Sequence, residues 1–212
     1  DVDCFKRNNY DLIGHINTHG IGGQITKYAN VADMKSHGIE VSISTKKIVT
    51  IDFSWTTDLV FSNIKTEVTK LDSRSRIFDY VTNTGFTRAG YPSRALFSIP
   101  FKGLNEDGIP TFLDQNGNVT VDEIYFQERN NVDFLIYEGP TDPTTSGGLG
   151  NLFRYKNFKL NVFMTYAFGN VVRLDPVFSS SYTDLTAMPK EFKNRWTLPG
   201  EENQTNVPVI LN

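Results

Sequence analysis

Two histidines have a spacing that could support chemistry. His15 and His19 lie four positions apart, which is the spacing of two zinc ligands on one face of a helix. The surrounding stretch "GHINTHGIGG" is rich in glycine and shows no helical pattern. We therefore expect a loop without a metal here. The overlapping "GIGGQ" at residues 20–24 is no phosphate-binding loop, because no strand-to-helix junction surrounds it.

The stretch "DQNGN" is a second candidate for ion binding. Asp114, Asn116 and Asn118 have the spacing that opens a calcium-binding loop. However, Gly117 comes one position too early for an EF-hand, and Tyr125 stands where the twelfth-position Glu would be needed. A turn built on Asn-Gly is the favoured interpretation.

The chain has two pairs of adjacent acids, Glu201 with Glu202 and Asp122 with Glu123. Such acids could act in a glycosidase only if two carboxylates faced each other across a sugar. Adjacent acids in polar loops are usually solvated instead. The chain has three His and one Cys, too few to argue for a Ser-His-Asp or Cys-His arrangement. We expect no catalytic, cofactor-binding or metal site, no cofactor, and a protein that is not an enzyme.

Composition excludes further classes. The 212 residues have a mean hydropathy of -0.33 and no run near the roughly 18 apolar residues that a membrane helix needs. The net charge of -3 and the scattered Lys and Arg argue against nucleic acid as a partner. A lone Cys4 gives no disulfide framework. Any membrane crossing must therefore use β-strands.

Alternation of apolar and polar residues is the strongest pattern in the chain. In "KLNVFMTYAFGN" (residues 159–170), every second residue from Leu160 to Phe168 is apolar, and most of the others are polar. The same period of two runs through "IDFSWTTDLVFSN" (51–63) and "GIEVSIST" (38–45). A period of two predicts β-strands, because successive side chains leave a pleated chain on opposite faces.

Short turns alternate with long connections. The turn "KKIV" (46–49) is predicted to join strands 38–45 and 51–63, and "KNF" (156–158) to join 148–155 and 159–170. The segments 14–29, 64–148 and 171–212 are long and rich in Gly, Asn, Pro, Ser and Thr, as in the extracellular loops of outer-membrane barrels. Strand pairing within 64–148 stays open: "ALFSIPFKG" (95–103) fits either a pair of further crossings or a hairpin within the loop.

The two faces of the strands differ in charge. No charge interrupts the apolar faces, whereas Glu40, Asp52, Asp58, Arg154 and Lys159 lie on the opposite faces. A soluble β-sandwich would show the same alternation, but strand length, the pattern of turns and the aromatics on the apolar faces favour an all-β fold that is part of a large antiparallel transmembrane β-barrel. Lipid contact is predicted for Trp55, Leu59, Val162 and Met164, and a lumenal position for Asp52, Asp58, Asn161 and Thr165.

The stretch "YEGPTDPTTSGGLGNLFRYKNFKLNVFMTYAFGN" (137–170) resembles a late-barrel segment of SusC/RagA-like TonB-dependent outer-membrane transporters. The resemblance rests on Pro143, the Gly147-Gly148 pair, Asn151, the aromatic turn at 155–158 and the final Gly-Asn. Other stretches resemble the same family in the same order: "FKRNNYDLI" (5–13), "NVADMKSHGIEVSIS" (30–44), "GYPSRALFSIPFKGLNEDGIPTFLDQNGN" (90–118) and "RWTLPGEE" (195–202).

This resemblance implies a barrel of about 22 strands with an N-terminal plug, located in the cell outer membrane. It implies TonB-dependent import of oligosaccharides or peptides, a SusD-like surface lipoprotein as a lid, contact with outer-membrane lipid, and a TonB complex reached through missing N-terminal parts. Residues 1–212 would be a fragment of the barrel domain, with the plug domain and the final strands absent. Lid contact is expected from Phe78, Tyr80, Phe86, Tyr91, Phe178 and Tyr182.

An alternative from a different class stays open: a soluble β-sandwich module that binds carbohydrate. Exposed aromatic side chains would then serve as stacking platforms for sugar rings. The candidates for this role are Tyr80, Tyr91, Tyr125 and Trp196. The sequence names neither the substrate nor the residues that contact it.

Overall fold

The computed structural model describes residues 1–17, 26–82, 84–174, 177 and 189–210, with side chains described except at 15–17 and 26–28. The chain divides into two compact units. Unit 1 consists of Asp1–Ser73, Gly85–Ala95 and Gly139–Val171, and unit 2 consists of Arg74–Thr84, Leu96–Glu138 and Val172–Asn212. None of the described helices is both long enough and apolar enough to cross a membrane.

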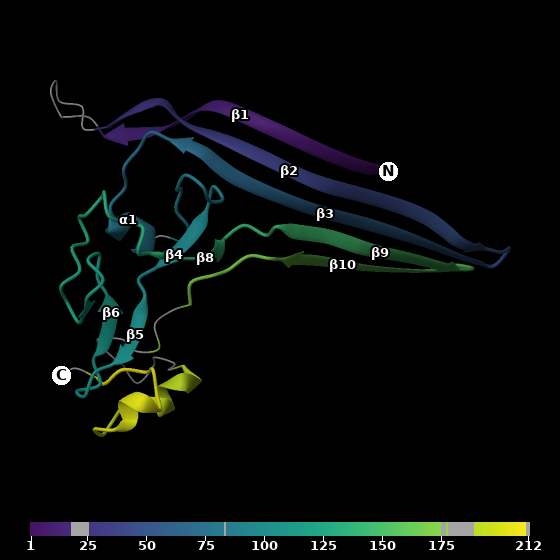
Figure 1. Cartoon of the computed structure of the whole chain (residues 1–212). Helices are drawn as coiled ribbons and strands as arrows, with labels where there is room; N and C mark the ends of the chain where they lie inside the picture. The colour runs from purple at the N-terminus through teal and green to yellow at the C-terminus, as the bar shows by residue number, and fades with distance from the viewer. Residues whose placement is uncertain (18–25, 83, 175–176, 178–188, 211–212) are drawn as a thin grey trace. The chain divides into compact units, whose positions relative to one another are not determined.

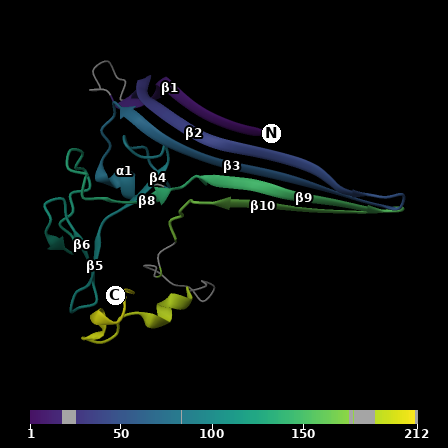
Figure 2. The ribbon, with the colours of Figure 1, turned by 45° about the vertical axis from the view of Figure 1, so that its right-hand side comes forward.

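Unit 1 is built on one five-stranded antiparallel sheet with the order β1-β2-β3-β9-β10 (Figure 1). The long strands lie side by side in both views (Figures 1 and 2). The alternating stretches of the sequence fall within them except at residues 51–52 and 169–170. Their bounds are β1 Val2–Asn17, β2 Thr26–Val49, β3 Phe53–Leu71, β9 Thr145–Tyr155 and β10 Phe158–Phe168.

Both predicted hairpins are confirmed, but one turn lies later than predicted. The turn between β2 and β3 is at residues 50–52, where the Phe53 N–H donates to Thr50 Oγ1 (3.0 Å). The predicted turn at 46–49 is wrong because the β2 register shifts between Lys46 and Ile48. This bulge lets β2 continue to Val49. The second turn, predicted at 156–158, lies at 156–157 between β9 and β10, and Phe158 is the first residue of β10.

Strands β1 and β2 run into segment 14–29, and β3 runs into segment 64–148, both of which are predicted as loops. These extensions lack an apolar period, so the sequence gives no sign of them. The backbone ladder still continues there, because ladder hydrogen bonds need no apolar side chains. A cross-strand ion pair between Lys35 Nζ and Glu67 Oε2 (3.0 Å) accompanies the ladder of β2 and β3.

Strand β3 has two neighbours along one edge. Strand β9 pairs with residues 53–63 of β3 and ends there. Beyond that point the Val68 N–H donates to the Tyr91 carbonyl (2.8 Å), and the Gly90 N–H donates to the Val68 carbonyl (2.8 Å). Because β9 follows β3 directly in the sheet, the described part of segment 72–144 contributes no further strand to this sheet.

Unit 2 contains short elements. The stretch "ALFSIPFKG" is split into β4 and β5, which belong to two different small sheets, so it is not a pair of membrane crossings. The break falls at Ile99-Pro100, and proline has no N–H to donate to a ladder. The bounds are α1 Ile77–Thr82, β4 Ala95–Ser98, β5 Phe101–Leu104, β6 Pro110–Leu113, β7 Val119–Thr120, β8 Ile136–Pro140, η1 Lys190–Asn194 and η2 Glu201–Asn203.

The core of unit 2 forms around α1. Ile77 and Phe97 are fully buried, and the ring of Tyr80 meets the ring of Phe97 edge-on at 5.3 Å. Arg76 and Asp79 fix the start of α1: the guanidinium Nη2 donates to Asp79 Oδ1 at 2.7 Å and holds the pKa of that carboxyl below its usual value. Tyr80 is therefore a core residue rather than an exposed aromatic.

Candidate membrane-facing surface

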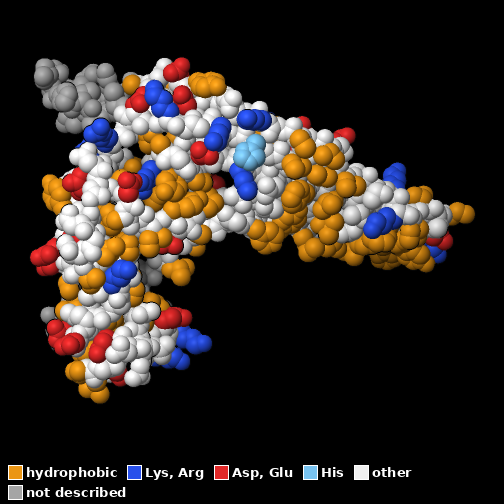
Figure 3. Space-filling model, viewed as in Figure 1, with side chains coloured by type: hydrophobic (Ala, Val, Ile, Leu, Met, Phe, Trp, Pro, Cys, Tyr) orange, Lys and Arg blue, Asp and Glu red, His pale blue; other side chains and the backbone are white. Residues whose placement is uncertain are grey.

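The register places most apolar residues of the stretches 39–61, 149–155 and 158–168 on one face of the sheet. For example, Ile43, Leu59, Leu149 and Met164 are successive cross-strand partners in one row. Cross-strand partners share a face. Figure 3 shows hydrophobic side chains gathered along these strands. Other members of this apolar face are Val41, Ile48, Phe53, Trp55, Phe61, Phe153, Tyr155, Phe158, Leu160, Val162, Tyr166 and Phe168.

This apolar face is exposed and has the length of a membrane crossing. Leu160 is 60% exposed and Met164 is 56% exposed. Strands β9 and β10 have 11 residues each, and β9 pairs along its whole length with residues 53–63 of β3. A transmembrane β-strand needs about 9 to 11 residues. The prediction that Trp55, Leu59, Val162 and Met164 share one face is confirmed by this register.

Several polar groups on the apolar face are paired with each other. Asn151 Oδ1 accepts hydrogen bonds from Trp55 Nε1 (3.0 Å) and from Thr57 Oγ1 (2.9 Å). Asn63 Nδ2 donates to Thr145 Oγ1 (2.7 Å). An unpaired polar group in hydrocarbon costs several kcal/mol. Because these polar groups are paired, the face is compatible with lipid. Asn151, a residue of the motif at 137–170, accepts the hydrogen bonds of Trp55 and Thr57 on this face.

The Gly147-Gly148 pair has a packing role. Tyr166 crosses over Gly147 and its hydroxyl donates to the Val60 carbonyl (3.2 Å). A Cβ at Gly147 would lie 2.4 Å from the Tyr166 Oη and 2.2 Å from the Val60 oxygen, which leaves no room for a side chain. On the other face, Phe163 covers Gly148, with 3.1 Å between its ring and an added Cβ. The missing side chain at each glycine therefore leaves room for an aromatic ring of β10 to pack against the backbone of β9.

The opposite face of the sheet is mainly polar. Ser44 Oγ donates to Asp58 Oδ1 (2.5 Å), and Asn161 and Thr165 share this face through the register. Phe163 also lies here and is exposed, so the face is not wholly polar. Asp52, predicted to face the lumen from within a strand, lies instead in the turn between β2 and β3.

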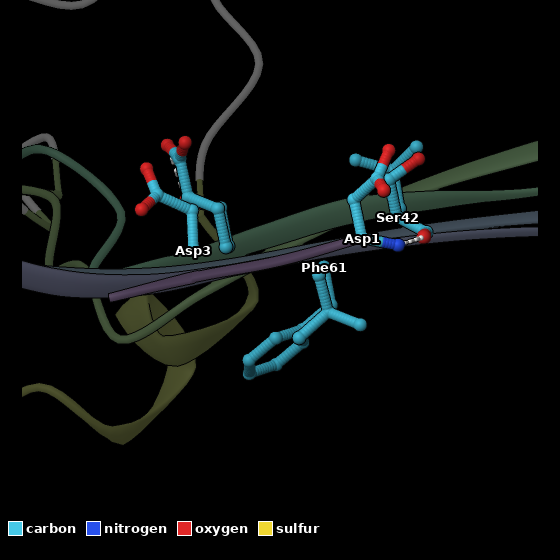
Figure 4. A pocket seen from close by; sticks show the side chains of 8 residues that line it. Asp1, Asp3, Ser42 and Phe61 are labelled. Carbon is cyan, nitrogen blue, oxygen red and sulfur yellow. Dashed lines mark hydrogen bonds between the residues drawn. The ribbon is translucent and has the colours of Figure 1, made fainter. Parts of the chain in front are cut away.

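A shallow hollow lies beside the start of β1. Asp1, Asp3 and Ser42 point to one side of the strands, and Phe61 points to the other (Figure 4). Its lining residues therefore belong to both faces of one sheet. The hollow is open and not an enclosed ligand cavity.

The acids Glu201 and Glu202 stabilise their own loop. Glu201 Oε2 accepts from the Thr197 N–H (2.7 Å) and the Leu198 N–H (3.1 Å), and these bonds lower the pKa of Glu201. Glu202 Oε2 accepts from Trp196 Nε1 (3.2 Å). Its own backbone amide and then the Trp196 indole lower the pKa of Glu202. Trp196 is buried, so it is not an exposed stacking platform.

The "DQNGN" stretch forms the turn between β6 and β7, as predicted. Asp114 Oδ1 accepts from the Asn118 N–H (2.7 Å) and the Asn116 N–H (2.8 Å), and the backbone of Asn118 is the main cause of the lowered pKa of Asp114. Gly117 has φ +86°, which favours glycine. Asn105 caps the turn between β5 and β6 in the same way, its Oδ1 accepting from the backbone two and four residues later.

In the described part of the chain, no group of three or more His, Cys, Asp or Glu side chains could hold a metal ion. The side chain of His15, all of His19 and residues 20–24 lie outside the described residues. The exposed Cys4 is a free thiol on β1.

A five-stranded antiparallel sheet with one exposed apolar face and strands of membrane-crossing length defines a class of fold, the wall of a transmembrane β-barrel. No protein-family model matches the chain. The chain is 27% identical over 191 residues to the TonB-dependent receptor SusC of Bacteroides thetaiotaomicron, which covers 82% of this chain and 18% of that protein. It is 26% identical over 168 residues to the TonB-dependent receptor P3 of Formosa agariphila, covering 72% of this chain and 16% of that one.

Solved structures give the same result for the fold. The chain superimposes on part of the RagAB peptide transporter with a TM-score of 0.70 at 22% identity, covering 99% of this chain and 23% of that one. It also matches the RagAB peptide importer in the 'open-open' state, with a TM-score of 0.66 at 18% identity, 100% of this chain and 23% of that one. In sequence and in fold, the chain thus resembles part of a SusC/RagA-like TonB-dependent transporter, as its motifs predict. The all-β barrel fold is confirmed.

Proposed function

We propose that this chain forms part of the wall of an outer-membrane barrel that imports oligosaccharides or peptides with energy from the TonB complex. The observation that carries the proposal is the two-sided sheet. Eleven-residue strands place exposed apolar side chains on one face and Asp58, Asn161 and Thr165 on the other. Lipid on one side and a water-filled lumen on the other account for both faces.

The unpaired edges of the sheet support a larger barrel. Strand β1 pairs only with β2, and β10 pairs only with β9, among the described residues. Each outer edge therefore presents unpaired N–H and C=O groups, which lipid does not tolerate. The chain spans 16% to 23% of the length of the curated relatives it matches. Residues 1–212 would thus be a fragment of a barrel domain, with a plug and the final strands supplied by other parts of a longer protein.

The alternative of a soluble carbohydrate-binding sandwich has less support. A sandwich buries the apolar faces of its sheets, whereas Leu160 and Met164 are exposed within unit 1. Two of its four proposed platforms, Tyr80 and Trp196, are buried at 5% and 9% exposure. No observation specifically favours this second function.

A SusD-like lipoprotein lid is the proposed partner of the long connections. Phe78 is 45% exposed, and its N–H donates to the carbonyl of Phe126, which is 40% exposed. Tyr125, also exposed, is the residue before it. We call Phe78, Tyr125 and Phe126 the α1 aromatic patch. Exposed aromatics from adjoining segments are typical of anchors in protein interfaces. Phe178 and Tyr182 lie outside the described residues.

Transport is tested with the full-length protein. We expect it to fractionate with the outer membrane, to need detergent for extraction and to shift its gel mobility on heating. Uptake of fluorescent oligosaccharides or peptides should depend on the transporter gene and on the TonB complex. Extraction in buffer alone would overturn the proposed location, and uptake that persists without TonB would overturn the proposed energy source.

Binding of the lipoprotein lid is tested separately, by comparing serine substitutions at two exposed apolar residues of unit 2. Phe78→Ser should reduce co-purification of the lipoprotein, because it removes an exposed ring from the α1 aromatic patch. Val119→Ser alters an exposed residue of β7 and should leave the yield unchanged. Equal yields for both variants and the unaltered protein would remove the α1 aromatic patch from the interface.

A further inference from the structure

A row of basic side chains crosses the apolar side of the sheet directly beyond the apolar residues. Lys6 of β1 pairs with His37 of β2, and His37 pairs with Lys65 of β3. The neighbouring row on the same face is Cys4, Ile39 and Asn63, a spacing of about 7 Å for two residues of a strand. We call Lys6, His37 and Lys65 the basic row.

The basic row is accessible. All three side chains are exposed. In the part of the chain that the structure describes, none of them forms an ion pair, whereas Lys35 in the next row is paired with Glu67. Figure 3 shows blue and pale blue side chains together at the margin of the hydrophobic surface.

The other end of the apolar face is different. There the last row is aromatic: Phe53, Tyr155 and Phe158 are cross-strand partners. The nearby cations are placed singly against rings, with Lys47 Nζ 4.6 Å from the centroid of Trp55 and Lys156 Nζ 5.6 Å from that of Tyr155. A row of basic side chains in register is thus confined to the end away from the hairpin turns.

A cation at the edge of a lipid-facing surface costs about 0–1 kcal/mol, far less than at the midplane, and it meets lipid headgroups. Adjacent strands are about 4.8 Å apart, so Lys6 and Lys65 lie about 10 Å apart across β2. Three donors over this width suit a headgroup that carries more than one phosphate. In the proposed orientation the basic row lies at the outer leaflet of the outer membrane, whose lipid A headgroup carries phosphates.

We infer that the basic row binds the phosphate groups of lipid A at the outer surface of the barrel. This rests on the proposed outer-membrane location, with the hairpin turns toward the periplasm. Lys6 and Lys65 supply ammonium groups to phosphate oxygens, and His37 supplies an imidazole N–H between them. The apolar face directly beneath the row contacts the acyl chains of the same lipid.

The test uses the full-length transporter carrying Lys6→Gln and Lys65→Gln together, with Lys159→Gln on the opposite face as the control. Each protein is placed in nanodiscs that contain lipid A, lipid A without its phosphates, or phosphatidylglycerol. Native mass spectrometry then measures the lipid retained. We expect the double variant to retain lipid A with roughly 30-fold lower affinity, from two lysine contacts, and the control to match the unaltered protein.

Equal retention of lipid A by the double variant and the unaltered protein would overturn the inference. Equal retention of lipid A with and without phosphates would overturn it as well. Stronger retention of phosphatidylglycerol than of lipid A would assign the row to phospholipid and refute the lipid A source. The heat-induced shift in gel mobility distinguishes failure of this inference from failure of the proposed function. A barrel that does not insert refutes the proposed location. An inserted barrel whose lipid A retention does not depend on Lys6 and Lys65 refutes only the role of the basic row.

Discussion

A lysine at Val162 should prevent barrel assembly, and a lysine at the neighbouring Asn161 should not. Val162 is the fifth of the 11 residues of β10 and lies on the apolar face opposite Asn151. It is four residues from Phe158 and six from Phe168, or about 14 Å and 20 Å along the strand. With a tilt near 45°, the nearer boundary is about 10 Å away, beyond the reach of a four-carbon lysine stem.

The expected penalty follows from that depth. A lysine at the midplane costs about 2–4 kcal/mol, which lowers the ratio of folded to unfolded protein by roughly 30-fold to 900-fold. Asn161 faces the other side of the same strand, opposite Leu152, where a charge can reach water. Both variants carry the same new side chain in the same strand, so the introduced residue and the net charge are matched.

The assay is the folded fraction of the full-length barrel in lipid vesicles, measured by heat-induced shift in gel mobility and by urea titration. The expected result is a large loss for Val162→Lys and a small change for Asn161→Lys. A similar loss at both positions, or a larger loss at Asn161, would refute the assignment of the apolar face to lipid.

Three further predictions concern other parts of the chain. Gly147→Val should abolish the heat-modifiable form, because its Cβ would lie 2.2 Å from the Val60 oxygen; normal folding would show that β9 and β10 do not pack as described. A cysteine at Asn130 should react with an impermeant thiol reagent on whole cells, and one at Asn157 only after permeabilisation; the reverse pattern would invert the topology. Asp114 has a lowered pKa, so its support of the β6–β7 turn is full above the ordinary carboxyl value and is lost as the pH falls through the lowered pKa. Amide exchange at Asn118 should accelerate in that acid range, and exchange that does not change there would contradict the role of the carboxylate.

The sequence predicted the long strands well where one face is apolar. Alternation from Leu160 to Phe168 and the short turn before it identify the β9–β10 hairpin without reference to any distant residue. Prediction failed where that signal ends. Residues 64–71 of β3 continue the ladder without an alternating apolar face. The bulge at Lys47 also moves the turn, because backbone hydrogen bonding does not depend on hydrophobicity.

Aromatic residues in the connections show the same division. Composition alone gives Tyr80 and Phe78 similar chances of being exposed, although they are two residues apart. In the structure Tyr80 packs against Phe97 and is buried, whereas Phe78 is exposed. Burial depends on contacts with residues distant in the sequence, and these have no local signature.

Within each stretch free of a bulge, the sequence by itself determined which side chains share a face, because the two-residue period is a property of the extended backbone. Only the tertiary structure decided which strands are neighbours and in which register. It placed β9 beside β3, brought Asn151 to the indole of Trp55, and aligned Lys6, His37 and Lys65 in one row. Register depends on turns, bulges and contacts between distant segments, and a shift of one residue would exchange the two faces of a strand.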